Sequence, residues 1–208
     1  MRSGTSRQAS GALATGKVLA GCLALALSMP GSAACSPEPL APSQETRQER
    51  EEYLVKAQIL LKLIPYVRWP EETEALGRPL IIAVLGRSPF EEQLDRTVRQ
   101  TPIIRGRPLK VIYVSHYTDD LACDLLFLCP SLAREAKGLL AKMRGRPVLT
   151  VADDDRFSAA GVMVSLLLQE DNRTRLVVNR GAAVAEGFAL NSQLLKVAKV
   201  IDTPRPTP

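Results

Sequence analysis

The sequence predicts an α/β fold: a single three-layer domain with a mostly parallel central sheet, a C-terminal antiparallel hairpin and helices on both faces. Three apolar runs each begin with Gly-Arg-Pro: "GRPLIIAVLG" from 77, "GRPLKVIYVS" from 106 and "GRPVLTVADD" from 145. Gly can end a preceding segment in the left-handed conformation, and Pro is tolerated at the first residue of a strand. Helical patterns separate several of these runs, and strands that alternate with helices indicate a parallel sheet.

Residues 1–34 have the composition of a secretory signal peptide. They contain three basic residues and no acid, and the apolar run "VLAGCLALALSM" is followed by small residues. As a helix this run of 12 residues rises about 18 Å, too little to span a bilayer core of roughly 30 Å. We therefore expect export and removal of this segment.

Residues 35–45 are expected to be a flexible tether, because three prolines interrupt them. Cys35 stands directly after the expected cut, in "SAAC", so a lipid anchor on Cys35 is an open alternative to release. Cys22 would leave with the signal peptide.

The predicted domain covers residues 46–201 and begins with an amphipathic helix. The stretch "TRQE" from Thr46 fits a capping box. Pro65 should bend the last turn, and Pro70 prevents the helix from continuing beyond Trp69. The apolar residues that follow at helical spacing are Tyr53, Ala57, Leu60, Leu61, Ile64 and Val67.

The remaining elements are predicted from apolar runs, helical spacing and turn residues. The run 124–129 is a fourth strand, and helical patterns start at 88 and 131. After position 160, "VMVSLLLQ", the turn "EDNR" and "TRLVVN" indicate a hairpin. The segment "NSQLLKVAKVI" predicts a closing helix, and residues 202–208 are expected to be a disordered tail.

The charge of the domain excludes one class of function. The chain has 27 basic and 22 acidic residues, and loss of the three basic residues of the leader leaves 24 against 22. No basic stripe with interleaved aromatic residues remains, so we expect no nucleic-acid partner.

No catalytic constellation is visible. "VLGRSPF" resembles a nucleophile elbow, but Pro89 follows Ser88 and has no N–H for an oxyanion hole. Ser88 is better explained as a helix N-cap with Pro89 as the first helical residue. One histidine, His116, and isolated cysteines cannot supply a zinc site, and the acids 153–155 indicate a solvated turn. We therefore expect no enzyme activity, no metal and no cofactor.

Four polar residues follow predicted strands: Arg87, Ser88, Ser131 and Asp153. The carboxyl ends of parallel strands meet at one edge of the sheet, where such folds bind ligands, and helix N-termini there favour anions. These loops are a candidate site for a small ligand.

Cys123 and Cys129 lie within the domain. A spacing of six places them about 20 Å apart in an extended strand, whereas a disulfide needs Cα atoms within about 7 Å. They can pair only if the segment bends, so we expect at least one buried free thiol.

The ordered set "YLVKAQILLKLIPYVRWP", "PLIIAVLGRSPFEEQL", "ACDLLFLCPS", "GRPVLTVADDDRFSAAGVMVSLL" and "LVVNRGAAVAEGFALNSQLLKVAKV" resembles the YfiR family over residues 50–201. The resemblance implies a small periplasmic α/β protein that is not an enzyme. Such proteins inhibit a membrane-bound diguanylate cyclase through its periplasmic sensor domain, which lowers cyclic-di-GMP signalling and biofilm formation, and some form homodimers. Redox-responsive relatives carry disulfides; because Cys123 and Cys129 are awkwardly spaced, we do not expect that control here.

Tyr66, Arg68 and Trp69 are candidate partner-binding residues, since Trp, Tyr and Arg are enriched at interaction hot spots. In a second interpretation, Trp69 fills the core beneath the first strand. The alternative function is a periplasmic small-ligand-binding protein that uses the loops at the carboxyl edge of the sheet.

Overall fold

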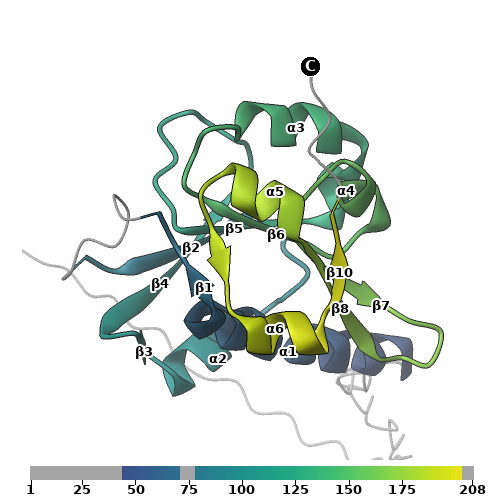
Figure 1. Cartoon of the computed structure of the whole chain (residues 1–208). Coiled ribbons are helices and arrows are strands. Elements are labelled where there is room, and N and C mark those ends of the chain that lie inside the picture. The colour runs from purple at the N-terminus through teal and green to yellow at the C-terminus, as the bar shows by residue number, and fades with distance from the viewer. Residues whose placement is uncertain (1–43, 71–77, 203–208) are drawn as a thin grey trace, which may run out of the picture. The chain divides into compact units, whose positions relative to one another are not determined.

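An eight-stranded sheet forms the centre of the domain in the computed structural model. The model describes residues 44–70 and 78–202 (Figure 1). The predicted signal peptide, Cys22, Cys35 and the predicted tail from 203 onward lie outside these ranges. The strand order is β10-β8-β7-β6-β5-β2-β4-β3. The strands are β2 (Leu80–Leu85), β3 (Ile103–Ile104), β4 (Arg107–Val114), β5 (Leu125–Leu128), β6 (Leu149–Ala152), β7 (Val164–Leu168), β8 (Thr174–Asn179) and β10 (Lys199–Ile201).

The predicted pairing is confirmed. Strands β4, β2, β5, β6 and β7 are parallel neighbours, and β7 and β8 form the antiparallel hairpin. At the two edges, β3 pairs antiparallel with β4, and β10 pairs parallel with β8.

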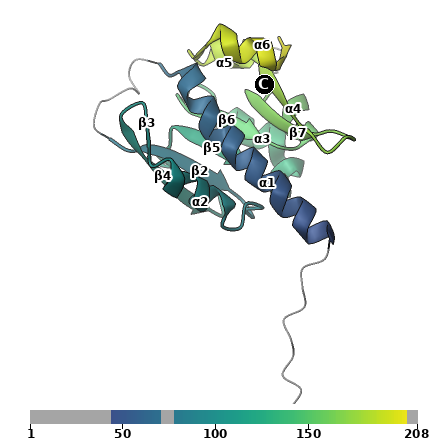
Figure 2. The ribbon, with the colours of Figure 1, turned by 90° about the horizontal axis from the view of Figure 1, so that it is seen from below.

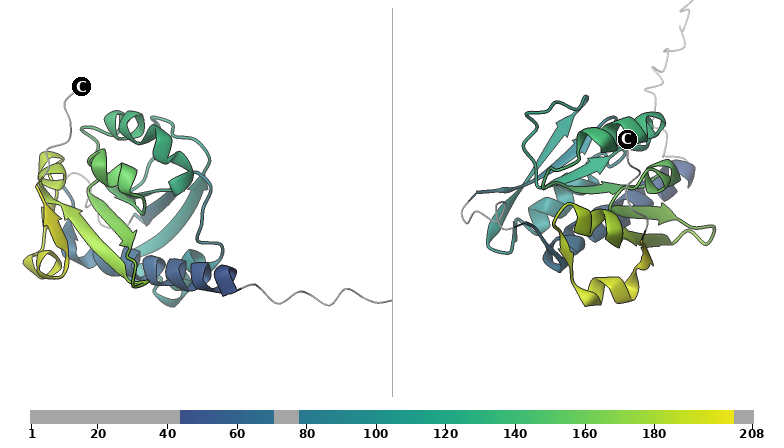
Figure 3. Two further views of the ribbon diagram at one scale, coloured as in Figure 1. Left: turned by 90° about the vertical axis from the view of Figure 1, so that its right-hand side faces the viewer. Right: turned by 45° about the horizontal axis from the view of Figure 1, so that its top comes forward.

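Helices cover both faces of the sheet (Figure 3). On one face lie α1 (Gln44–Leu63) and α2 (Gln93–Gln100), and on the other lie η3 (Pro130–Glu135), α3 (Ala136–Lys142) and α4 (Asp155–Ala159). Side chains of β2 alternate between the two cores: Ile82 and Val84 pack toward α1, whereas Ala83 and Leu85 pack toward α3. Burial on both faces explains why the strands are nearly continuous apolar runs.

Helix α1 crosses the sheet and is followed directly by a tight turn (Figure 2). Its predicted core positions Ala57 and Leu60 are fully buried. The helix begins at Gln44, so Thr46 lies in its first turn and is not the N-cap of the predicted capping box. Pro65 sits in the 3-10 turn η1 (Ile64–Tyr66), and β1 (Val67–Arg68) then pairs with β9 (Ala189–Leu190).

Two further boundaries differ from the prediction. Helix α2 begins at Gln93, because Glu91 adopts a positive φ of 46°. The Ser88 hydroxyl therefore accepts a hydrogen bond from the Phe90 N–H (3.3 Å) in a turn that precedes the helix. Ser88 is not the N-cap of α2. The predicted closing helix is split: α6 (Ser192–Val197) is followed by β10, whose backbone pairs with β8.

The helix α5 (Arg180–Ala185) was also missed. Its N-cap is Asn179, whose side chain accepts from the Ala182 N–H (3.1 Å). The buried residues Ala182 and Ala183 then turn toward the core shared with α1.

Asp124 joins the amino ends of the central strands. Its buried carboxylate accepts from both terminal nitrogens of Arg78 (2.6 and 3.1 Å), from Arg107 (3.0 Å) and from the Ile81 N–H (2.8 Å). Its backbone bonds to Ile81 of β2 and to Leu149 of β6. Arg78 and Arg107 belong to the first two Gly-Arg-Pro triplets, which were interpreted from turn chemistry alone.

We expect Asp124→Asn to destabilise the domain by about 3 kcal/mol, because it leaves two guanidinium groups without their buried counter-charge. The free energy of unfolding from urea titration measures this. Asp119→Asn, at an exposed position, is the control and should change stability by less than about 0.5 kcal/mol. Equal stability of both variants would show that the Asp124 carboxylate does not stabilise the amino ends of the central strands.

Candidate functional site

The structure separates the three candidate partner-binding residues. Trp69 is only 3% exposed; its indole N–H donates to the Asp124 carbonyl (3.0 Å), and its ring packs edge-on against Phe188 (6.1 Å). Its burial fits the core interpretation and does not fit direct contact with a partner. Tyr66, 38% exposed, and Arg68 lie on the surface.

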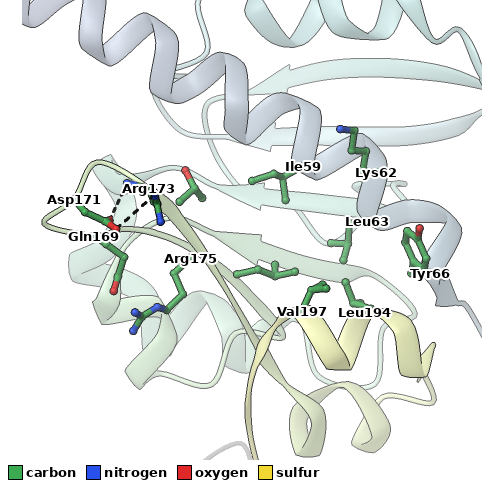
Figure 4. A pocket seen from close by; sticks show the side chains of 12 residues that line it. Ile59, Lys62, Leu63, Tyr66, Gln169, Asp171, Arg173, Arg175, Leu194 and Val197 are labelled. Atoms are coloured by element: carbon green, nitrogen blue, oxygen red, sulfur yellow. Dashed lines mark hydrogen bonds and ion pairs between the residues drawn. The ribbon is translucent and has the colours of Figure 1, made fainter.

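Tyr66 borders an open groove with a volume of about 480 Å³, which we call the α1–α6 groove (Figure 4). It runs between α1, α6 and the hairpin of β7 and β8. Val197 is 76% exposed on its wall. The lining residues are Ile59, Lys62, Leu63, Tyr66, Gln169, Asp171, Arg173, Thr174, Arg175, Leu176, Leu194 and Val197.

The groove combines an apolar wall with a basic rim. Ile59, Leu63, Leu194 and Val197 supply aliphatic surface from two helices. Lys62, Arg173 and Arg175 supply three cations and Asp171 one acid, which faces Arg173 at 3.7 Å. The surface therefore fits a partner segment that is apolar on one side and acidic around it.

Sequence reasoning found Tyr66 but missed the rest of this groove. The closing helix was predicted over the whole stretch "NSQLLKVAKVI", and no exposed position on it was singled out. Val197 is exposed because that helix ends there and the chain turns into β10.

Three of the four predicted ligand-loop residues come together at the carboxyl edge. Arg87, Ser88 and Ser131 line one pocket of about 350 Å³. Asp153 does not reach it, because its side chain is completely buried beneath α1.

The carboxylate of Asp153 forms its hydrogen bonds with side chains of α1. Its Oδ2 accepts from the Tyr53 hydroxyl (2.8 Å) and from Lys56 Nζ (3.1 Å), and Lys56 also pairs with Glu52. Burial raises the pKa of Asp153, while Lys56 and the Tyr53 hydrogen bond oppose that shift. Burial also raises the pKa of Tyr53, and the Asp153 carboxylate adds to this rise.

The solvated turn predicted for the three successive acids is therefore wrong for the first of them. Asp154 instead caps α4 by accepting from the Arg156 N–H (2.8 Å), and Asp155 is exposed. The buried acid could not be recognised locally, because its partners lie about a hundred residues earlier in the chain.

Both thiols of the domain are free, as expected for at least one of them. They flank β5 at its two ends, and Cys129 is fully buried. Burial raises the pKa of Cys123 to about 12, against the effect of Arg146, and that of Cys129 to about 12. Neither thiol is therefore activated for nucleophilic chemistry.

Across residues 44–70 and 78–202, no group of three or more His, Cys, Asp or Glu side chains could hold a metal ion. His116 is exposed in a loop. In the same part of the chain no helix has both the length and the apolar content needed to cross a membrane.

A mostly parallel sheet with helices on both faces defines the chain as an α/β protein, and an apolar groove and a polar pocket lie on its surface. It belongs to the YfiR/HmsC-like family, whose model matches residues 53–199. This is a regulatory, non-catalytic family of periplasmic proteins.

One solved structure supports the fold. A conserved domain protein from Vibrio cholerae O1 biovar eltor superposes with a TM-score of 0.52 at 12% identity over 71% of this chain and 59% of its own. The ABC domain from Streptococcus pneumonia, solved with L-Trp, gives 0.47 at 13% identity over 72% and 60%. The chain thus spans about three-fifths of each of these proteins.

We expect the Cys123 and Cys129 thiols to resist labelling by Ellman's reagent at pH 8 in the folded protein. Their raised pKa values keep them protonated at that pH, since an ordinary cysteine ionises near 8.5. The measurement uses a chain with Cys22→Ser and Cys35→Ser, so that only these two thiols report. Rapid labelling without denaturant would contradict their burial.

We expect Tyr53→Phe to cost about 1.5 kcal/mol of stability, because it removes a hydrogen bond to a buried carboxylate. Chemical denaturation measures the loss. Tyr113→Phe is the matched control, since Tyr113 donates to Asp95 at an exposed site, and its effect should be within about 0.5 kcal/mol. Equal losses of unfolding free energy in the two variants would show that the hydrogen bond to Asp153 stabilises the fold no more than an exposed one does.

Proposed function

We propose that this chain is a periplasmic, non-enzymatic regulator that binds the periplasmic sensor domain of a membrane-bound diguanylate cyclase and inhibits it. Its action lowers cyclic-di-GMP signalling and biofilm formation. Membership of the YfiR/HmsC-like family carries this proposal, because the match covers nearly the whole described domain.

The α1–α6 groove is the proposed contact surface. Hot spots at protein interfaces combine aromatic and basic residues with well-packed apolar contacts, and this groove offers Tyr66 and Arg175 around the aliphatic side chains of Ile59 and Val197. An exposed apolar surface with a polar rim is a common mark of a binding site.

The proposed compartment agrees with the leader-like composition of residues 1–34. In this arrangement the domain meets only the periplasmic part of the cyclase, so inhibition must pass through the sensor domain and across the membrane. Binding free energy at the groove would supply the shift between active and inactive cyclase.

We expect Val197→Asp to weaken binding to the purified sensor domain by at least about tenfold, because it places a charge on the apolar wall of the groove. Biolayer interferometry measures the affinity. Val184→Asp is the matched control: Val184 is 61% exposed on α5 and lies outside the groove, so binding should be unchanged.

Equal weakening by the two substitutions would remove the groove from the interface. A sensor domain that binds neither the wild-type chain nor its variants would overturn the regulatory proposal itself.

A further inference from the structure

The topology of the sheet creates a crevice at the carboxyl ends of β2 and β5. These strands are parallel neighbours, and Leu85 at the end of β2 is paired with Leu128 at the end of β5. The chain leaves β2 toward α2 on the α1 face, but leaves β5 toward η3 and α3 on the opposite face. Open α/β sheets bind ligands at such a point, where successive connections diverge.

A polar pocket of about 350 Å³ occupies this position, and we call it the switch-point pocket. Three segments form it: the first half of α1, the loop after β2 and the start of η3. Its lining residues are Thr46, Glu49, Arg50, Tyr53, Arg87, Ser88, Pro89, Glu91, Pro130 and Ser131.

Beside the pocket, the loop after β2 approaches the side chains at the start of η3 closely. Gly86 has a φ of +96°, and a Cβ at this position would come within 2.8 Å of the Ser131 hydroxyl oxygen. Glycine therefore lets the two loops touch, and the Arg87 N–H donates to Ser131 Oγ (3.1 Å).

Two hydroxyl groups keep their protons available. Ser131 Oγ accepts from Arg87, and Ser88 Oγ accepts from the Phe90 N–H. Because a hydroxyl that accepts one bond still has its own donor, each can donate to a bound group.

The charged side chains around the pocket differ in whether another side chain already pairs with them. Arg50 is paired with Glu91 at 2.9 Å, so these two side chains largely neutralise each other. Among the described residues, Arg87 has no ion-pair partner and its side chain is exposed. Glu49 also borders the pocket and lowers its net positive charge.

We propose that the switch-point pocket binds a small anionic group, a carboxylate or a phosphate, with Arg87 as its charge partner and Ser88 and Ser131 as hydroxyl donors. Charge-assisted hydrogen bonds from a guanidinium are the strong ones in such sites. This site is separate from the α1–α6 groove and does not depend on the proposed regulation of a cyclase.

The test titrates the full chain, purified after export, with sodium phosphate and in parallel with sodium acetate at constant ionic strength. Two-dimensional amide NMR follows the backbone signals of residues 86–88 and 131. We expect saturable shifts confined to these signals with at least one anion, and Arg87→Ala should weaken the affinity by about tenfold or more. Arg99→Ala, an exposed cation in α2 outside the pocket, should leave it unchanged.

Saturation by phosphate alone would assign a phosphorylated ligand, and saturation by acetate alone a carboxylate. Shifts that never saturate, or an Arg87→Ala variant that binds like the wild-type chain, would overturn the site. Because no cyclase domain is present, the result is independent of the partner-binding experiment.

Discussion

The buried carboxylate of Asp124 is the constraint on which the domain depends. A charge without solvent must be compensated, and here two arginines and a backbone N–H surround it. Its own backbone bonds reach β2 and β6, and its carbonyl accepts the indole N–H of Trp69. The register of the central strands and the path of the chain after α1 are therefore tied to one residue.

The two candidate binding surfaces are the switch-point pocket at the carboxyl ends of β2 and β5 and the α1–α6 groove. Helix α1 contributes to both candidates: Thr46 to Tyr53 border the switch-point pocket, and Ile59 to Leu63 border the α1–α6 groove. Between these two stretches of α1, Lys56 forms an ion pair with Asp153, which follows the end of β6. The same helix is thus a core element and a wall of two distinct surfaces.

The strand β5 keeps the two thiols of the domain too far apart to form a disulfide. Cys123 and Cys129 flank an extended strand and lie about 20 Å apart by its rise per residue, far beyond the reach of a disulfide. A Cys123–Cys129 bridge therefore cannot carry a signal to this domain in this fold. The apolar groove and the polar pocket offer two chemically different surfaces for binding.

The sequence by itself determined the α/β class, the mostly parallel direction of the central strands, the hairpin and the core face of α1, because these follow from local periodicity and turn chemistry. It also placed Arg87, Ser88 and Ser131 at one edge. Only the tertiary structure decided that Trp69 and Asp153 are buried, that Arg78 and Arg107 share Asp124, and that the closing helix ends at Val197. Those outcomes rest on partners far away in the chain, and a local pattern does not encode which distant segment a side chain meets.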